Sequence, residues 1–215
     1  MIKPYYQDDY VTLYHGDCRD ILPQLEPVDL VLTDPPYGIG EAAGVNKSRG
    51  KLAIAKDYGN DNWDNKPIAQ DLINQLITQP AIVFGGNYYA MPASSCWLVW
   101  DKQNGATDFA DCELAWTNLP GAVRKLSYVW HGMIKQRPEQ RWHPTQKPLD
   151  VMKWCITQAD TKLKKTVGTI LDPFTGAGTT LRAAKDMNRK SIGIEREQKY
   201  CDVIVQRLRQ EVLPL

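Results

Sequence analysis

VGTILDPFTGAGTT, residues 167–180, gives the clearest indication of how this chain folds. Its apolar run up to Leu171 predicts a buried strand, and Gly176 and Gly178 predict a tight turn into a helix. Backbone N–H groups at the start of such a helix can face a bound ligand. A phosphate-binding P-loop would carry a lysine before the threonine, which GAGTT lacks. The stretch therefore predicts a strand–turn–helix unit of an α/β protein.

An acidic residue follows this unit at the spacing that is typical of Rossmann-type nucleoside sites. KSIGIER, residues 190–196, predicts the next strand, and Glu195 ends it. In Rossmann-type sites an acid roughly 20 residues beyond the glycines binds ribose hydroxyls. The glycines and Glu195 together favour a nucleoside site, and a plain tight turn between strand and helix is the alternative.

A second strand ends in an unusual way. TDPPYGIG, residues 33–40, follows the apolar run VDLVL. Proline has no backbone donor and holds the preceding residue extended, so the chain leaves the strand stiffly. The exit would present the Asp34 carboxylate, the Pro35 carbonyl and the Tyr37 ring at one edge. This is a set of hydrogen-bond acceptors beside a stacking surface.

Short apolar runs alternate with helical spacing along the rest of the chain, which favours an α/β fold. CELAWTN and VRKLSYVW, residues 112–118 and 123–130, are expected to pair antiparallel at one sheet edge. The other expected strands are residues 11–17, 28–34, 81–86 and 96–102, and the expected helices are residues 18–25, 67–78, a stripe of Leu149, Met152, Cys155 and Ala159, and a last helix with Tyr200, Ile204 and Leu208.

Composition narrows the class of protein. The 215 residues carry a net charge of +1, are 43% hydrophobic and contain five scattered cysteines. No Cys-x-x-Cys pair occurs, so neither a zinc site nor a disulfide framework is indicated. No window approaches the length of a membrane span. We expect one domain over residues 1–215, reduced thiols, no metal and a cytoplasmic location.

Three motifs occur in a fixed order: DPPY at residues 34–37, HPTQKP at 143–148 and DPFTGAGTT at 172–180. Their identity and order closely resemble the β-class DNA amino-methyltransferases, which modify adenine N6 or cytosine N4 with S-adenosylmethionine. The resemblance spans nearly the whole chain. It implies a Rossmann-like methyltransferase sheet that is circularly permuted and mostly parallel, with an antiparallel edge.

The resemblance also implies roles for individual residues. The catalytic motif would be Asp34, Pro35, Pro36 and Tyr37. The glycine turn would cradle the methionine part of the cofactor, and Glu195 would bind its ribose hydroxyls. Asp17 and the Cys18 backbone would lie near its adenine. Thr145 and Lys147 would approach its carboxylate. The complete implied cofactor set is Asp17, Cys18, Thr145, Lys147, Asp172, Phe174, Thr175, Gly176, Gly178, Thr179 and Glu195.

The acceptor set suits methyl transfer to a base amine. The amine lone pair is delocalised into the ring, and acceptors that hold both N–H bonds can aim it at the methyl group. The base must first be flipped out of the duplex, and Tyr37 can stack on it. Aspartate at position 34 favours adenine over cytosine N4. An RNA or protein methyltransferase, or a non-catalytic DNA-binding regulator of the same fold, could also carry motifs of this kind.

Two irregular segments are expected to meet DNA. Residues 38–66 form a long polar loop that we expect to close over the flipped base. Residues 131–142 give only a short target-recognition segment, which predicts a short or degenerate target and leaves room for a homodimer. Neither the target nor a restriction partner can be identified from these residues. The expected phosphate contacts are Arg124, Lys125, Lys135, Arg137 and Arg141.

Overall fold

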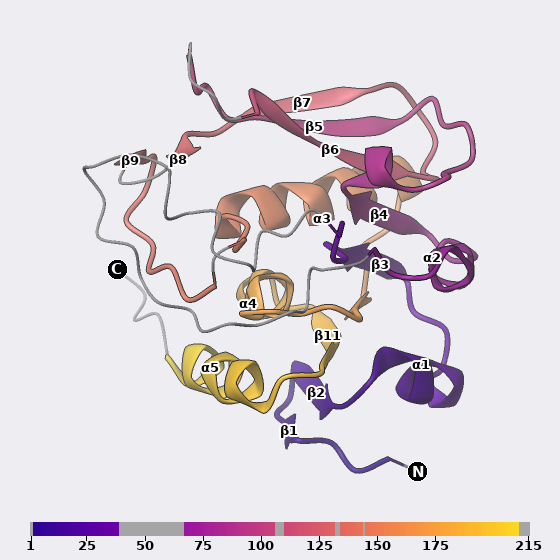
Figure 1. The fold of residues 1–215 in the computed structure, drawn as a ribbon, viewed down its shortest axis with the longest axis vertical. Coiled ribbons are helices and arrows are strands. Elements are labelled where there is room, and N and C mark those ends of the chain that lie inside the picture. Colours follow the sequence, from indigo (N-terminus) through magenta and orange to yellow (C-terminus); the bar gives the residue numbers. More distant parts are fainter. Residues whose placement is uncertain (1, 39–66, 106–109, 132–133, 144, 211–215) are drawn as a thin grey trace.

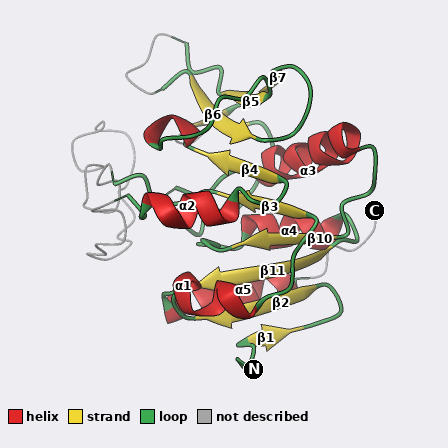
Figure 2. Ribbon diagram, turned by 90° about the vertical axis from the view of Figure 1, so that its right-hand side faces the viewer, coloured by secondary structure: helices red, strands yellow, loops and turns green. Residues whose placement is uncertain are grey.

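The computed structural model describes residues 2–38, 67–105, 110–131, 134–143 and 145–210. Nine of the described strands form one sheet, in the order β1-β2-β11-β10-β3-β4-β6-β5-β7 (Figure 2). Their bounds are β1 Tyr6–Gln7, β2 Val11–His15, β3 Leu30–Thr33, β4 Ala81–Phe84, β5 Trp97–Asp101, β6 Cys112–Thr117, β7 Arg124–Ser127, β10 Thr169–Asp172 and β11 Lys190–Glu195. A separate antiparallel pair joins β8, Trp130–His131, to β9, Ile134–Lys135.

The centre of the sheet is parallel, as expected. Strands β2, β11, β10, β3 and β4 all pair in parallel, whereas β6 is antiparallel to both β4 and β5. The expected pairing of residues 112–118 with 123–130 is wrong. Strand β5 lies between β6 and β7 and pairs with β7 in parallel. Both hydrogen-bonding edges of β5 are therefore paired, which a β6–β7 hairpin would not provide.

Helices cover both faces of the sheet (Figure 1). On one face lie α3, Leu149–Leu163, α4, Thr179–Asp186, and α5, Gln198–Arg209. On the other lie α1, Cys18–Ile21, and α2, Gln70–Leu76. Two short 3₁₀ turns complete the described elements, η1 at Leu22–Gln24 and η4 at Gly86–Tyr88. The expected apolar stripes on α3 and α5 are confirmed, because Met152, Cys155, Ala159, Tyr200, Ile204 and Leu208 are buried and Leu149 packs partly buried against the core.

The central strands are buried on both faces, which explains their continuous apolar runs. In β3, Leu30 and Leu32 pack with α3 and α4, while Val31 packs in the cluster that contains α1 and α2. In β10, Ile170 and Leu171 divide between the same two clusters. Each residue therefore points to the face opposite its neighbour.

The parallel strands bring the sequence motifs together. β2, β3, β10 and β11 run in one direction, so Asp17, Asp34, Pro173 and Glu195 follow or end them at the same edge of the sheet. Ligands of open α/β sheets bind at this carboxyl edge. The topology alone therefore joins motifs that are far apart in the chain.

The expected closing loop, residues 38–66, falls outside the described residues except for Gly38. Among the residues that are described, no helix is both long and apolar enough to cross a membrane.

Candidate functional site

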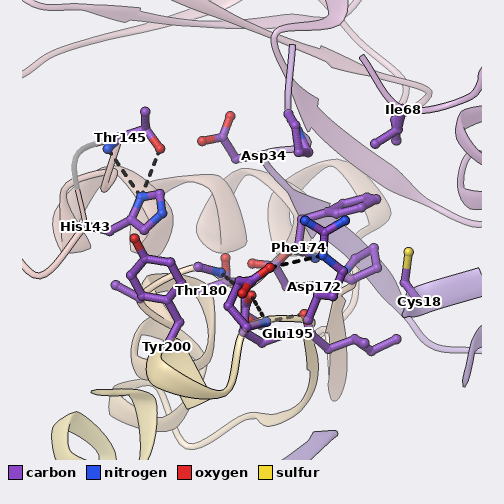
Figure 3. A pocket seen from close by; sticks show the side chains of 18 of the residues that line it. Cys18, Asp34, Ile68, His143, Thr145, Asp172, Phe174, Thr180, Glu195 and Tyr200 are labelled. Atoms are coloured by element: carbon purple, nitrogen blue, oxygen red, sulfur yellow. Dashed lines mark hydrogen bonds and ion pairs between the residues drawn. The ribbon is translucent and has the colours of Figure 1, made fainter. Parts of the chain in front are cut away.

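A pocket of about 470 Å³ opens at the carboxyl edge of the sheet (Figure 3). Every residue of the implied cofactor set lines it except Gly178. Asp34 and Pro36 of the DPPY motif also line it. Segments far apart in the sequence thus share one cavity, as the motif order predicts.

The glycine turn is built as the sequence indicates. Gly176 and Gly178 have φ of 50° and 73°, in the left-handed region that favours glycine. Gly178 caps α4, and its N–H donates to the Thr175 carbonyl over 2.7 Å. A Cβ at residue 178 would lie 2.9 Å from Ile204 of α5. The turn therefore needs glycine there both for its backbone angle and for the close packing of α5.

Glu195 links the end of β11 to this turn. Its Oε2 accepts from the Gly176 N–H over 2.8 Å, and its Oε1 accepts from the Glu197 N–H over 2.9 Å. Burial raises the pKa of Glu195 to about 7, although these backbone donors work in the opposite direction. Each carboxylate oxygen retains a second lone pair. The side chain can therefore accept further hydrogen bonds from a ligand.

Asp17 borders the opposite part of the pocket. It caps α1, and its carboxylate accepts from the Arg19 backbone N–H over 2.9 Å and from the Arg19 guanidinium over 2.5 and 2.9 Å. This pairing lowers the pKa of Asp17 to about 2. Arg19 also lines the pocket and was not expected from the sequence, because nothing in its motif distinguishes it from a solvated helix residue.

Asp172 joins the two central strands. Its Oδ1 accepts from Thr33 Oγ1 over 2.7 Å and from the Phe174 N–H over 3.1 Å. The side chain is buried, and burial raises its pKa to about 6. One carboxylate therefore ties the last residue of β3, which precedes Asp34, to the loop that follows β10.

Both oxygens of the Asp34 carboxylate have a partner in the structure. Its Oδ1 accepts from the Tyr37 hydroxyl, and its Oδ2 lies 2.5 Å from Nζ of Lys147. Lys147 also lies 3.1 Å from Oε2 of Glu113 in β6. We expected Lys147 to face a ligand carboxylate. An ammonium group has three donors, so these two ion pairs do not exhaust it.

The Tyr37 ring lies against Gly85, just before η4, and against Tyr88, the last residue of η4. It stacks on the ring of Tyr88 with centroids 4.8 Å apart and planes 12° apart. Tyr88 is 48% exposed. Neither Pro35 nor Tyr37 lines the pocket itself, so the DPPY motif borders it through Asp34 and Pro36. The ring is thus beside the pocket and next to an exposed aromatic side chain.

Other lining residues were missed from the sequence. The ring of His143 meets Tyr200 edge-on, with centroids 4.6 Å apart and planes 62° apart, and its Nδ1 lies 3.1 Å from Thr145 Oγ1 (Figure 3). Ile68 and Leu72 add an apolar wall. Tyr200, Ile68 and Leu72 carry only the helical periodicity of core residues, so pattern alone could not separate them from the core.

The five basic residues expected to contact DNA lie outside the pocket lining. Arg124 and Lys125 are on the edge strand β7, and Lys135 is on β9. Arg137 is exposed and lies 3.4 Å from Asp150, while Lys125 lies 3.0 Å from Asp101. Arg141 Nε lies 3.4 Å from the His143 carbonyl. The structure thus places these residues on β7, on β9 and in the chain that leads to HPTQKP.

A family model described as DNA methylase (N6_N4_Mtase) matches residues 95–206, more than half of the chain. The chain belongs to this family of DNA methylases. The match contains HPTQKP, the glycine turn and Glu195, and the DPPY motif lies upstream of it. The methylase is therefore a β-class amino-methyltransferase, as its motif order predicts.

Curated relatives match nearly the whole methylase. Type II methyltransferase M2.LlaDCHI of Lactococcus lactis subsp. cremoris is 27% identical, over 97% of this chain and 93% of that protein. Type II methyltransferase M2.DpnII of Streptococcus pneumoniae is 26% identical, over 98% and 94%. DNA methyltransferases of restriction–modification systems are thus similar to it over their full fold.

Solved structures agree on the fold. The M1.HpyAVI–SAM complex gives a TM-score of 0.54 at 22% identity, over 92% of this chain and 99% of that one. The PvuII DNA methyltransferase, described as cytosine-N4-specific, gives 0.57 at 16% identity, over 99% and 91%. The expected α/β class with a mostly parallel methyltransferase sheet is confirmed.

Proposed function

We propose that this methylase transfers a methyl group from S-adenosylmethionine to the N6 amine of adenine in DNA. The observation that carries the proposal is Asp34 at the carboxyl end of β3. It borders a pocket whose other walls include the glycine turn after the neighbouring strand β10. An acceptor for the base amine and a site for a nucleoside cofactor are thus adjacent.

The pocket fits S-adenosylmethionine by size and chemistry. Its volume of about 470 Å³ lies within the usual range for small-molecule sites. Glu195 offers acceptors for ribose hydroxyls, Asp17 offers acceptors for an adenine amine, and Phe174 offers an apolar surface. When bound, the cofactor supplies an electrophilic methyl group on a positively charged sulfur.

The residues of the DPPY motif would prepare the acceptor base. Asp34 and the Pro35 carbonyl accept hydrogen bonds from the two N–H groups of the amine. These hydrogen bonds turn the lone pair of the nitrogen toward the methyl group. Tyr37 stacks on the flipped base. In the free protein the Tyr37 hydroxyl donates to Asp34 Oδ1, so the base amine exchanges with that hydroxyl when it enters. Positioning and electrostatics then carry the reaction, without a covalent enzyme intermediate.

Adenine is the preferred target because the first motif residue is Asp34. Transfer to cytosine N4 is the second candidate, since the same acceptors can hold that amine. Incubation with duplex DNA and S-adenosylmethionine, followed by mass spectrometry of the nucleosides, separates the two. We expect N6-methyladenine, and N4-methylcytosine alone would contradict the adenine assignment. Cofactor binding without any transfer would favour a non-catalytic regulator.

We propose that DNA lies along the segment from β7 to HPTQKP. Arg124, Lys125, Lys135, Arg137 and Arg141 would neutralise phosphates, which fixes position without reading sequence. Residues 131–142 offer few side chains for base edges, which favours a short target. A second copy of the chain adding contacts, and residues 1–215 acting as one domain, are parts of the same proposal.

A further inference from the structure

A chain of charges, half-buried except at the buried Lys147, joins Asp34 to the antiparallel strand β6. Lys147 is only 7% exposed, and its Nζ lies 2.5 Å from Asp34 Oδ2 and 3.1 Å from Glu113 Oε2. Glu113 in turn lies 2.6 Å from Nζ of Lys102, at the outer end of the chain. These side chains come from four segments, and Glu113 and Lys102 belong to none of the three motifs.

The sheet places Glu113 at the same edge as Asp34. Strand β6 is antiparallel to β4, and Ala115 pairs with Phe84, the last residue of β4. Glu113 precedes Ala115 by two residues, so it extends past the end of β4 on the side where β3 also ends. Lys147 Nζ lies 5.3 Å from the centre of the Phe84 ring and 5.9 Å from that of Tyr37. The ammonium is therefore confined by two rings and two carboxylates.

The pKa values of the two carboxylates shift in opposite directions, although burial by itself raises both. Burial raises the pKa of Asp34; Lys147 opposes this effect, and Glu113 adds to it. Burial alone would also raise the pKa of Glu113, but Lys147 and Lys102 together outweigh it and lower that pKa. Burial alone would lower the pKa of Lys147, but Asp34 and Glu113 outweigh it and raise that pKa. Lys147 thus stays charged, and the charge of Asp34 depends on how Lys147 is shared.

We propose that Glu113 is a positioning residue of the transfer site. By holding part of the Lys147 ammonium, it keeps the Asp34 carboxylate in place and leaves its oxygens able to accept from the target amine. The negative charge of Glu113 itself raises the pKa of Asp34. The inference rests on the proposed function, because it assigns Asp34 as the acceptor. Without Glu113, Lys147 would pair with Asp34 alone and compete with the base for its oxygens.

Other groups near Asp34 also affect the pH at which it titrates. The Tyr37 hydroxyl donates to it, and the charge of Asp34 in turn affects Asp172 on β10. The Tyr89 hydroxyl donates to the Pro36 carbonyl over 2.5 Å. These groups are present in every variant below, so they shift all the curves together.

The test measures the ionisation of Asp34 in three proteins: wild type, Glu113→Gln and Lys147→Gln. Carbon-13 NMR of the labelled carboxyl group, across a pH series, reports it without any methyl transfer. Glu113→Gln removes a like charge, so Asp34 should titrate about 1 pH unit lower; Lys147→Gln removes an opposite charge, so it should titrate about 1–3 pH units higher. The acidic limb of the transfer rate should move in the same two directions.

The turnover number, kcat, reports whether Lys147 competes with the base for the Asp34 oxygens. In Glu113→Gln we expect kcat to fall about tenfold or more at the pH optimum, while cofactor affinity stays within twofold. Glu26→Gln, at an exposed position, is the matched control and should leave both curves unchanged. Thermal melting of each variant checks that it is folded.

The outcomes separate the two ideas. If Asp34 titrates as in the wild type in both folded variants, the role of Glu113 is overturned. If the opposite shifts occur and kcat falls, the role is supported. Absence of methyl transfer in the wild-type protein, with Asp34 shifting as expected, would count against the proposed function and not against the charge arrangement.

Discussion

Gly85 lies directly against the ring of Tyr37: a Cβ at position 85 would be 2.0 Å from Cε1 of that ring. Gly85 also has a φ of 65°. Gly85→Ala should therefore displace the ring that we propose stacks on the flipped base. We expect kcat to fall by about 10²-fold, the scale of a misplaced catalytic group, with unchanged cofactor affinity.

Gly105 provides a matched control for that substitution. Its φ of 63° is nearly the same, but a Cβ there would meet no atom of the described residues within 4 Å. Gly105→Ala thus carries the backbone strain without the contact. Comparable losses of kcat in both variants would show that strain, and not the Tyr37 contact, is responsible.

Substitution of Asp34 should separate transfer from cofactor binding. Asp34→Asn keeps the shape of the side chain but removes its charge and one acceptor oxygen. We expect transfer to drop below detection while the affinity for S-adenosylhomocysteine, measured by calorimetry, stays within a few-fold. A parallel loss of affinity would place Asp34 in the cofactor site.

Glu195 should make cofactor binding depend on pH. Its pKa is about 7 in the free protein, above the ordinary value of 4.5, so it holds a proton below pH 7. Ribose hydroxyls donate more strongly to the ionised form. Affinity should therefore rise with pH up to about 7 and then level off, and calorimetry in two buffers should detect proton release at pH 6.

The Glu195→Gln variant tests that explanation. It should lose about 1.5–3 kcal/mol of binding free energy at pH 8 and show a flat pH dependence. The folded state of the wild type should also lose stability as the pH rises from 4.5 to 7, because the folded protein holds this proton longer than the unfolded chain. A variant with unchanged affinity and slope would remove Glu195 from the site.

The double variant Arg137→Ala/Arg141→Ala tests the DNA surface. It should weaken binding at all sequences and reduce the slope of log affinity against log salt by about 2, one for each lost phosphate contact. Lys3→Ala/Lys190→Ala removes the same charge from exposed positions elsewhere and should leave the slope unchanged. Equal slopes in the two double variants would move the DNA surface elsewhere.

Much of the fold was accessible from the sequence because the central strands are buried on both faces. VDLVLTD, VGTILDPF and KSIGIER read as strands for that reason, and each ends in a residue at the carboxyl edge of the sheet. The edge strands were harder. The β6–β7 pairing was mispredicted because hydrophobic pattern does not state which strand lies between two others.

The site divides in the same way. Motifs predicted the acids and the glycine turn of the pocket lining, since backbone turns and acids leave a sequence signature. Glu113 and Lys102 left none, because a charged residue on a half-buried strand looks like any solvent-facing position. The pairing of β6 with β4 brings Glu113 to Lys147 and Lys102, and sequence pattern does not specify that pairing. The arrangement of Tyr37 and Tyr88 was hidden for the same reason: it joins loops after two different strands.

The Thr33–Asp172 hydrogen bond fixes the ends of two neighbouring strands to each other at the edge of the pocket. It joins the ends of β3 and β10, which are neighbours in the ladder, and adjacent strands lie about 4.8 Å apart. The residues that we propose hold the base follow one of these strands, and the glycine turn follows the other. Backbone pairing therefore sets the spacing between these two segments, which are separated by 139 positions in the chain.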